Sequence, residues 1–246
     1  MHSPVRTIET NVHGTEVVLN CAAKKGKPVM LASTSEVYGK SARLPFRESD
    51  DLVLGSTKIG RWSYAVSKAL DECLGLAYWT ERGLPVTVLR FFNTVGPRQT
   101  GRYGMVLPTF VRQALRGEPL TIHETGEQRR CFSYVGDVVE ALVRLAQTPA
   151  AVGEVVNIGN DREVTINELA TLVREITGSP SRVEHVPYDQ AYGPGFEDME
   201  RRMPCLEKLE SLVHYRPATS LEAIVRRVVD YEWVRQMPQR ALAVAV

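Results

Sequence analysis

In the N-terminal part of the chain, helical segments alternate with short apolar runs, and this order constrains the fold more than any other feature. Residues 4–25 have a helical pattern, PVMLAS (28–33) is apolar, residues 64–82 are helical again, and PVTVLRFF (85–92) is apolar and β-branched. Runs that are apolar along their whole length are typical of strands buried on both faces. Strands that alternate with helices of this length build a parallel sheet. The order therefore predicts an α/β fold with a doubly wound, Rossmann-like parallel sheet.

The second half of the chain has shorter and less regular elements, which predict a smaller mixed α/β lobe. The predicted elements are helices at 106–116, 136–147, 167–177 and 219–236, strands near 119–123, 154–158 and 182–186, and a loop at 187–195. We expect residues 1–98 to form the sheet with the catalytic residues. Residues 99–246 are expected to form mainly the second lobe, with some segments returning to the sheet.

One signature of a complete dinucleotide-binding sheet is missing from this sequence. Such a sheet opens with a strand and a glycine-rich turn, whose backbone amides hold a pyrophosphate at a helix N-terminus. The 18 glycines never fall into a GxGxxG or GxxGxxG spacing, and the helix at 4–25 precedes the first apolar run. We therefore expect a partial sheet that lacks its first strands and its pyrophosphate cradle.

Composition argues against several classes of function. The 246 residues include 30 Lys+Arg and 29 Asp+Glu, so the net charge of +1 gives no overall attraction to nucleic acid or to an anionic membrane. No apolar run approaches the roughly 20 residues of a membrane helix, and the first residues lack the apolar core of a secretory signal. The expected location is the cytoplasm. Neither a metal site nor a disulfide framework is expected, because the four cysteines are widely spaced: Cys21, Cys73, Cys131 and Cys205.

Tyr64 and Lys68 are the first candidates for catalysis. They form a Y-x-x-x-K motif, and at this spacing on a helix their Cβ atoms lie about 5–6 Å apart. The lysine ammonium is expected to favour the phenolate and to lower the pKa of Tyr64 well below its usual value of about 10. Such a phenolate can take a proton from a sugar hydroxyl while hydride leaves the same carbon. Alone the motif is weak, because many helices carry Tyr and Lys at this spacing by chance.

Polar side chains at the ends of both predicted strands give the motif a context. Thr34, Ser35 and Glu36 follow the first strand, and Asn93 and Thr94 follow the second. Ligands of open α/β sheets bind beyond the carboxyl ends of the strands, so these side chains are expected to converge with the Tyr/Lys pair. Turn formation alone also accounts for Ser, Thr and Asn at such places. Three polar clusters that converge on one site favour the functional interpretation.

Six stretches of the sequence together resemble the extended short-chain dehydrogenase/reductases that modify nucleotide sugars, the NAD-dependent epimerase/dehydratase family. The stretches are NVHGT (11–15), ASTSEVYG (32–39), YAVSK (64–68), RFFNTVGPR (90–98), GEPLTIHETGEQRRCFSYVGDVVEAL (117–142) and GEVVNIGN (153–160). The last two belong to that family's substrate lobe. The resemblance implies NAD as cofactor, a UDP-sugar as substrate, and a homodimer that packs through the helices at 4–25 and 64–82.

The resemblance also implies roles for individual residues. The residues implied in catalysis are Tyr64, Lys68, Thr34, Ser35, Glu36 and Arg202. Those implied in cofactor binding are Asn11, Tyr64, Lys68 and Thr94, and those implied in substrate binding are Thr34, Asn93, Val106, Arg130 and Arg202. Arg130 is expected to bind the diphosphate, and a solvated pair of Arg129 and Arg130 is the alternative. His123 is expected to be structural, and Phe91 and Phe92 are expected to belong to the core.

Within the family, the triplet Thr34-Ser35-Glu36 and Arg202 in RRMP (201–204) resemble the UDP-glucuronate decarboxylases. In that branch Tyr64 would take the proton of the sugar 4-hydroxyl as hydride moves to NAD. The resulting 4-keto sugar is a β-keto acid, which loses carbon dioxide readily, and the hydride then returns to C4. Ser35 speaks against a 4,6-dehydratase, because those enzymes often have Asp at this position.

Two other functions stay open at this point. A sugar 4-epimerase shares the Tyr/Lys pair and the hydroxyl at Thr34. An inactive relative that binds only a nucleotide sugar or a protein partner is an alternative of another class. Cys205 departs from the decarboxylase pattern, because the family usually has an acidic residue after the proline of its R-x-P segment. Because no pyrophosphate cradle is found, we expect this chain alone to bind NAD poorly.

Overall fold

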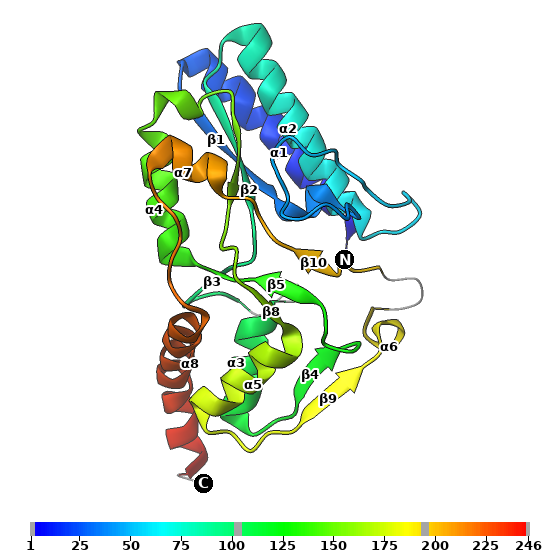
Figure 1. Ribbon diagram of the computed structural model, residues 1–246, viewed down its shortest axis with the longest axis vertical. Coiled ribbons are helices and arrows are strands. Elements are labelled where there is room, and N and C mark those ends of the chain that lie inside the picture. Colours follow the sequence, from blue (N-terminus) through cyan, green and yellow to red (C-terminus); the bar gives the residue numbers. More distant parts are fainter. Residues whose placement is uncertain (1–2, 101–104, 193–196, 245–246) are drawn as a thin grey trace.

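The computed structural model describes residues 3–100, 105–192 and 197–244, and the chain forms two lobes stacked along the long axis of the molecule (Figure 1). The helices are α1 (Pro4–Lys25), α2 (Trp62–Arg82), α3 (Val106–Arg116), α4 (Val135–Ala146), α5 (Ile166–Thr177), α6 (Tyr188–Tyr192), α7 (Glu207–Val213) and α8 (Leu221–Val244), with 3-10 helices η1 (Ser35–Tyr38) and η2 (Pro149–Ala151). The strands are β1 (Val29–Thr34), β2 (Val86–Phe91), β3 (Thr94–Val95), β4 (Leu120–His123), β5 (Arg129–Cys131), β6 (Ser133–Tyr134), β7 (Val155–Ile158), β8 (Glu163–Thr165), β9 (Val183–Val186) and β10 (Arg201–Arg202).

The first lobe is built on a parallel sheet in the order β1-β2-β7. Side chains of the central strand β2 alternate between its two faces. Val86 and Val88 pack under α1 and α2, whereas Leu89 and Phe91 pack against α4 and α7. The sheet is therefore covered by helices on both faces, as Figure 1 shows, and the carboxyl ends of β1 and β2 point toward the second lobe.

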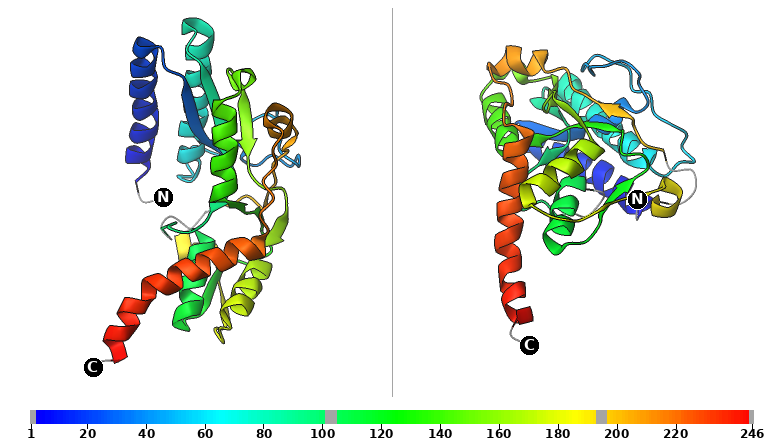
Figure 2. Two further views of the ribbon diagram at one scale, coloured as in Figure 1. Left: turned by 90° about the vertical axis from the view of Figure 1, so that its left-hand side faces the viewer. Right: turned by 60° about the horizontal axis from the view of Figure 1, so that its bottom comes forward.

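The second lobe packs α3, α5 and α8 around its own apolar core, in which Phe110, Leu120 and Leu169 are buried. β4 pairs with β9, and β5 lies between β10 and β8. α5 begins with a capping box, in which Thr165 and Glu168 satisfy each other's backbone amides. Figure 2 shows that α8 extends beyond the rest of this lobe. β10 and β5 lie where the two lobes meet, and this position brings their arginines to the end of the sheet.

The structure confirms the α/β class and the parallel sheet, and every predicted helix and strand has a counterpart within two or three residues of its predicted start. The loop predicted at 187–195 is wrong in part, because Tyr188–Tyr192 form α6 directly after Pro187. The Pro187 carbonyl accepts hydrogen bonds from the amides of Gln190 and Ala191. Proline favours this place because its fixed φ suits a first helical turn. Residues 193–195 lie outside the described part of the chain.

Several short elements were not predicted. These are α7, η1, η2 and the strands β3, β5, β6, β8 and β10, each of which has two to seven residues. Segments of this length carry too few residues for a hydrophobic period to show. The division of the chain after residue 98 stays a prediction, and β7 and α7 from the later part pack in the first lobe.

Candidate active site

The end of β1 forms one wall of the candidate site. Thr34 ends the strand in an extended conformation, and its Oγ1 accepts a hydrogen bond of 3.3 Å from the Glu36 amide, which begins the short helix η1. Thr34 and Ser35 are buried and Glu36 is half-buried. Because the hydroxyl caps η1, the strand turns sharply and presents all three side chains at the carboxyl end of the sheet.

Tyr64 lies on the first turn of α2 and faces the same strand end. Its hydroxyl hydrogen-bonds with Thr34, which favours the phenolate, but burial and the carboxylates of Glu36 and Asp71 outweigh this effect and raise the pKa of Tyr64. The expectation that Lys68 lowers this pKa below its usual value is therefore wrong. The Lys68 ammonium lies 2.8 Å from Asp71 Oδ2, and this carboxylate takes up its charge.

Lys68 and Asn11 lie at a cavity of about 300 Å³ between α1 and the open side of β1. Asn11 Nδ2 donates a hydrogen bond of 2.9 Å to Ser67 Oγ, and Ser67 in turn donates to the Tyr64 carbonyl at 2.8 Å. Met30 of β1 also lines the cavity. Two of the predicted cofactor residues, Asn11 on α1 and Lys68 on α2, therefore line the same cavity.

Asn93 and Thr94 lie beyond the end of β2, as predicted, but their side chains are engaged with backbone. Asn93 Nδ2 donates to the Cys131 carbonyl at 3.1 Å, and Thr94 Oγ1 donates to the Phe92 carbonyl at 3.4 Å. Thr94 begins β3, which pairs with β6. Val106 is half-buried at the start of α3. These residues tie the end of the sheet to the second lobe, and roles in binding stay predictions.

Three arginines from separate segments meet two carboxylates beside Tyr64. Arg202 Nη1 lies 3.1 Å from Glu36 Oε1, and Arg61 Nη2 lies 3.6 Å from Glu36 Oε2. Asp198 is contacted by Arg130 at 2.8 Å, by Arg61 at 3.0 Å and by Arg202 at 3.6 Å. Three guanidinium groups thus face two carboxylates, which leaves one excess positive charge.

Burial shapes the electrostatics of this arginine cluster, defined as Arg61, Arg130 and Arg202. Burial, together with the charge of Arg202, lowers the pKa of Arg130 to about 10 although Asp198 opposes the shift. Burial of Asp198 disfavours its charge, but Arg130, Arg202 and Arg61 outweigh that effect and hold its pKa below the usual value. Arg129 is exposed, whereas Arg130 is buried, so the two are not a solvated pair. The cluster is built to hold anions in a partly dry place.

Sequence reasoning missed Arg61, Asp71 and Asp198. Asp71 follows Tyr64 by seven positions and Lys68 by three, so helical periodicity alone could have placed it on their face of α2. Arg61, at the N-cap of the same helix, offered a similar signal. Asp198 carried none, because it lies in an irregular segment, and two of its partners, Arg61 and Arg130, are far away in the sequence.

The other predicted residues have structural surroundings. Phe92 is fully buried, and Phe91 packs against the apolar core between the sheet and the helices α4 and α7. His123 ends β4, and burial lowers its pKa. No group of His, Cys, Asp or Glu within the described residues could hold a metal ion, and no described helix is long and apolar enough to cross a membrane.

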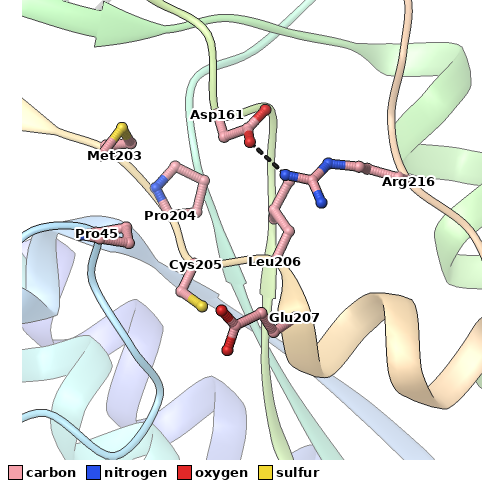
Figure 3. A pocket seen from close by; sticks show the side chains of 8 residues that line it. All are labelled: Pro45, Asp161, Met203, Pro204, Cys205, Leu206, Glu207 and Arg216. Carbon is pink, nitrogen blue, oxygen red and sulfur yellow. Dashed lines mark hydrogen bonds and ion pairs between the residues drawn. The ribbon is translucent and has the colours of Figure 1, made fainter.

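A second, smaller cavity of about 180 Å³ lies around the segment that follows β10 (Figure 3). The buried Cys205 lines it, and Arg216 forms an ion pair with Asp161 at its side. None of the residues predicted for catalysis or binding lines this cavity. Cys205, which stands where the family usually has an acidic residue, therefore lines this smaller cavity together with none of the predicted site residues.

Comparison with known proteins now fixes the family. A model of the NAD dependent epimerase/dehydratase family matches residues 1–159. The chain belongs to this family. The chain is 42% identical over 238 residues to UDP-N-acetyl-alpha-D-glucosaminuronate decarboxylase from Bacillus cytotoxicus, and the aligned region covers 96% of this chain and 73% of that protein. It is 36% identical over 232 residues to UDP-glucuronic acid decarboxylase 1 from Danio rerio, which covers 94% of this chain and 53% of that protein. The chain thus spans about half the length of the zebrafish relative.

Solved structures of epimerases in the family resemble the fold closely. The UDP-glucose 4-epimerase of Thermotoga maritima, solved with UDP-glucose, superposes with a TM-score of 0.85 at 30% identity and covers 95% of this chain and 72% of that chain. The UDP-glucuronic acid 4-epimerase of Bacillus cereus, solved with UDP-glucuronic acid and NAD, has a TM-score of 0.80 at 26% identity, covering 93% and 68%. The predicted fold and family are therefore confirmed, whereas substrate and reaction need an argument from the site.

Proposed function

We propose that this chain carries the catalytic residues and the sugar site of an NAD-dependent decarboxylase that acts on UDP-glucuronate or a closely related UDP-sugar acid. One observation carries the proposal: Glu36 lies beside the Tyr64/Thr34 pair with a guanidinium at each of its oxygens, from Arg202 and Arg61. A site for sugar oxidation and a site for a carboxylate thus adjoin. The two relatives named above are decarboxylases of this kind of sugar acid.

The residues present fit one end of NAD. The cavity beside β1 offers the Lys68 ammonium, the Asn11 amide and an apolar wall that includes Met30, a donor set suited to ribose hydroxyls and a ring. Asp71 Oδ1 is buried without a hydrogen-bond partner near this end. Bound there, NAD would supply the hydride acceptor. No described helix follows a glycine-rich turn of the pyrophosphate-binding kind, so the fit covers the nicotinamide-ribose end only.

Tyr64 performs the proton chemistry in this proposal. Its phenolate takes the proton of the sugar 4-hydroxyl while C4 is oxidised to a ketone. Thr34, which already hydrogen-bonds Tyr64, holds the reacting oxygen in place. Burial raises the pKa of Tyr64. A positive charge close to its hydroxyl, such as the Lys68 ammonium or the charged ring of NAD, would therefore be needed before the phenolate forms readily near neutral pH.

Loss of the carboxylate is the second step of the proposed reaction. A ketone at C4 makes the sugar acid a β-keto acid, so the electrons of the breaking bond move onto the ketone oxygen that Tyr64 and Thr34 hold. The resulting enolate takes up a proton at C5. The hydride then returns to C4 while Tyr64 gives its proton back to the oxygen, which restores the 4-hydroxyl.

Arg202 and Ser35 orient the carboxylate together with Arg61. Glu36 keeps the two arginines in place, with contacts of 3.1 Å to Arg202 and 3.6 Å to Arg61. In a pyranose ring C5 adjoins C4 whereas C1 lies across the ring, so the anion beside Tyr64 is the carboxylate and not the diphosphate.

The remaining arginine of the cluster suits the diphosphate. Arg130 lies on β5, and its Nη2 is held 2.8 Å from Asp198. A planar guanidinium that is already fixed binds phosphate oxygens in a bidentate manner at little cost in entropy. Asn93 and Val106 at the junction of the lobes would complete the nucleotide-sugar site, and Thr94 would lie toward the cofactor.

A homodimer is the proposed assembly. α1 and α2 lie side by side on one face of the sheet, and both expose apolar side chains that the chain itself leaves uncovered. Val17, Val66 and Leu70 are all more than two-fifths exposed. A second copy that packs its own α1 and α2 there would bury them in a four-helix interface.

The function is tested on the full product of the gene, incubated with NAD and either UDP-glucuronate or UDP-N-acetyl-alpha-D-glucosaminuronate. Nuclear magnetic resonance of the product identifies the sugar. A UDP-pentose and carbon dioxide are expected. A six-carbon acid with inverted C4 would instead assign a 4-epimerase, for which the same Tyr64/Thr34 pair suffices. Binding of the UDP-sugar without any turnover would assign the inactive, binding-only alternative.

A further inference from the structure

Asp71 is a buried acid that the proposed reaction does not use. It lies on α2 one turn after Lys68, and its side chain is completely shielded from solvent, with 0% exposure. Its Oδ2 is 2.8 Å from the Lys68 ammonium, whereas its Oδ1 has no hydrogen-bond partner in the described structure. A buried carboxylate with one unsatisfied oxygen costs free energy, so a structural role alone explains it poorly.

The neighbours of this pair leave Asp71 as the group that engages Lys68. Glu72, the next residue on α2, is bound by Arg90 of β2 at 2.7 Å, and this pair lies on the sheet side of the helix. Glu36 of η1 is engaged by Arg202 and Arg61. The charged groups that act on Tyr64 are therefore the carboxylates of Glu36, from η1, and of Asp71, from its own helix.

We propose that Asp71 is a positioning residue, which holds the Lys68 ammonium on its side of α2 and keeps the Tyr64 hydroxyl protonated while the cofactor cavity is empty. The inference rests on the roles proposed above for Tyr64 and Lys68. As a consequence, the Lys68 ammonium does not stabilise the Tyr64 phenolate while the cofactor cavity is empty. A ligand that draws Lys68 toward the cavity competes with Asp71, so cofactor binding and the protonation of Tyr64 are linked.

Titration of Tyr64 tests this without substrate or turnover. Tyrosinate absorbance in the near ultraviolet is followed against pH for the wild-type chain and for Tyr64→Phe, and the difference between the two curves reports Tyr64. Asp71→Asn removes the charge and keeps the shape, and it is expected to lower the Tyr64 midpoint by about one pH unit. Each Asp71 variant is paired with its own Tyr64→Phe double variant. Asp71→Glu, which keeps the charge, is expected to restore most of the wild-type midpoint.

Two controls separate positioning from structure. Glu81→Gln removes an exposed acid from the same helix and is expected to leave the midpoint unchanged. Asp71→Ser provides a second neutral variant, and circular dichroism checks that each variant is folded. A midpoint that stays or rises in the folded neutral variants would overturn the inference. Unfolding of both neutral variants would overturn it too, in favour of a purely structural acid. Neither result bears on decarboxylation, which the product analysis tests separately.

Discussion

Arg202 Nη1 lies 3.1 Å from Glu36 Oε1, although 166 positions separate the two residues in the sequence. Glu36 follows the first strand of the sheet, and Arg202 comes from β10, where the lobes meet. The pair therefore joins the part of the chain that carries the catalytic tyrosine candidate to the part that would bind the sugar. This ion pair thus links the residues of the two lobes that form the candidate active site.

Arg61 is predicted to recognise the sugar carboxylate and not the nucleotide. Arg61→Gln is expected to weaken UDP-glucuronate binding about tenfold or more, because a charge-assisted contact is lost, and to leave UDP binding nearly unchanged. Arg130→Met is expected to weaken both ligands. Isothermal titration calorimetry with the two ligands measures this, and Arg226→Gln, which removes an exposed arginine from α8, is the control. Equal losses for UDP and UDP-glucuronate in Arg61→Gln would refute the assignment.

The pH dependence of the reaction follows from the raised pKa of Tyr64. The phenolate is the active form, and below its pKa the phenolate fraction rises tenfold for each pH unit. Therefore kcat/KM, which reports the free enzyme, is expected to increase between about pH 7 and about pH 9. Asp71→Asn is expected to move this rise to lower pH. A profile that falls over the same range would show that Tyr64 is not the base.

Asp198 is predicted to stabilise the fold through the arginine cluster. Asp198→Asn is expected to cost about 2 kcal/mol of unfolding free energy near neutral pH, because three guanidinium groups lose their shared anion. The folded pKa of Asp198 lies below its usual value of 3.8, so the stabilisation is present above that pH and is lost as the pH falls through the folded pKa.

Urea unfolding of wild type and Asp198→Asn at neutral pH and at about pH 3 measures the effect. The difference between the two proteins is expected to shrink at the lower pH. A difference that is constant with pH would mean that the charge of Asp198 contributes nothing to stability.

The α1/α2 face is predicted to hold the dimer together. Leu70→Glu places a charge in the proposed four-helix interface and is expected to shift the protein to monomers in sedimentation experiments. Val143→Glu on α4 is a matched control, because Leu70 and Val143 are each 50% exposed. An unchanged dimer in Leu70→Glu, or a monomer in the wild-type protein, would contradict the prediction.

The sequence predicted the parts of the site that follow from strand order. Thr34 and Tyr64 meet because a helix that follows a parallel strand begins at the edge of the sheet where the strand ends, and that rule needs only the order of helices and strands. Arg202 was reached through resemblance alone, because nothing local in RRMP (201–204) indicates that it returns to Glu36.

Long-range pairing and burial account for what the sequence did not reveal. The Tyr64 pKa was predicted in the wrong direction because helical spacing shows which groups are near but not which of them is already paired. Lys68 has Asp71 as its partner, and burial acts on Tyr64 more strongly than either. Asp198 depends on how the segment before β10 folds over the arginines, which no period in the sequence reveals.

Release of carbon dioxide from the labelled sugar acid distinguishes decarboxylation from epimerisation. The full gene product is incubated with NAD and UDP-glucuronate labelled with carbon-13 at the carboxylate, and labelled carbon dioxide is followed by mass spectrometry. Wild type is expected to release labelled carbon dioxide, and Tyr64→Phe, which keeps the ring and removes the base, is expected to release it at least about a hundredfold more slowly. Retention of the label in the sugar by wild type, or undiminished release by Tyr64→Phe, would contradict the proposed mechanism.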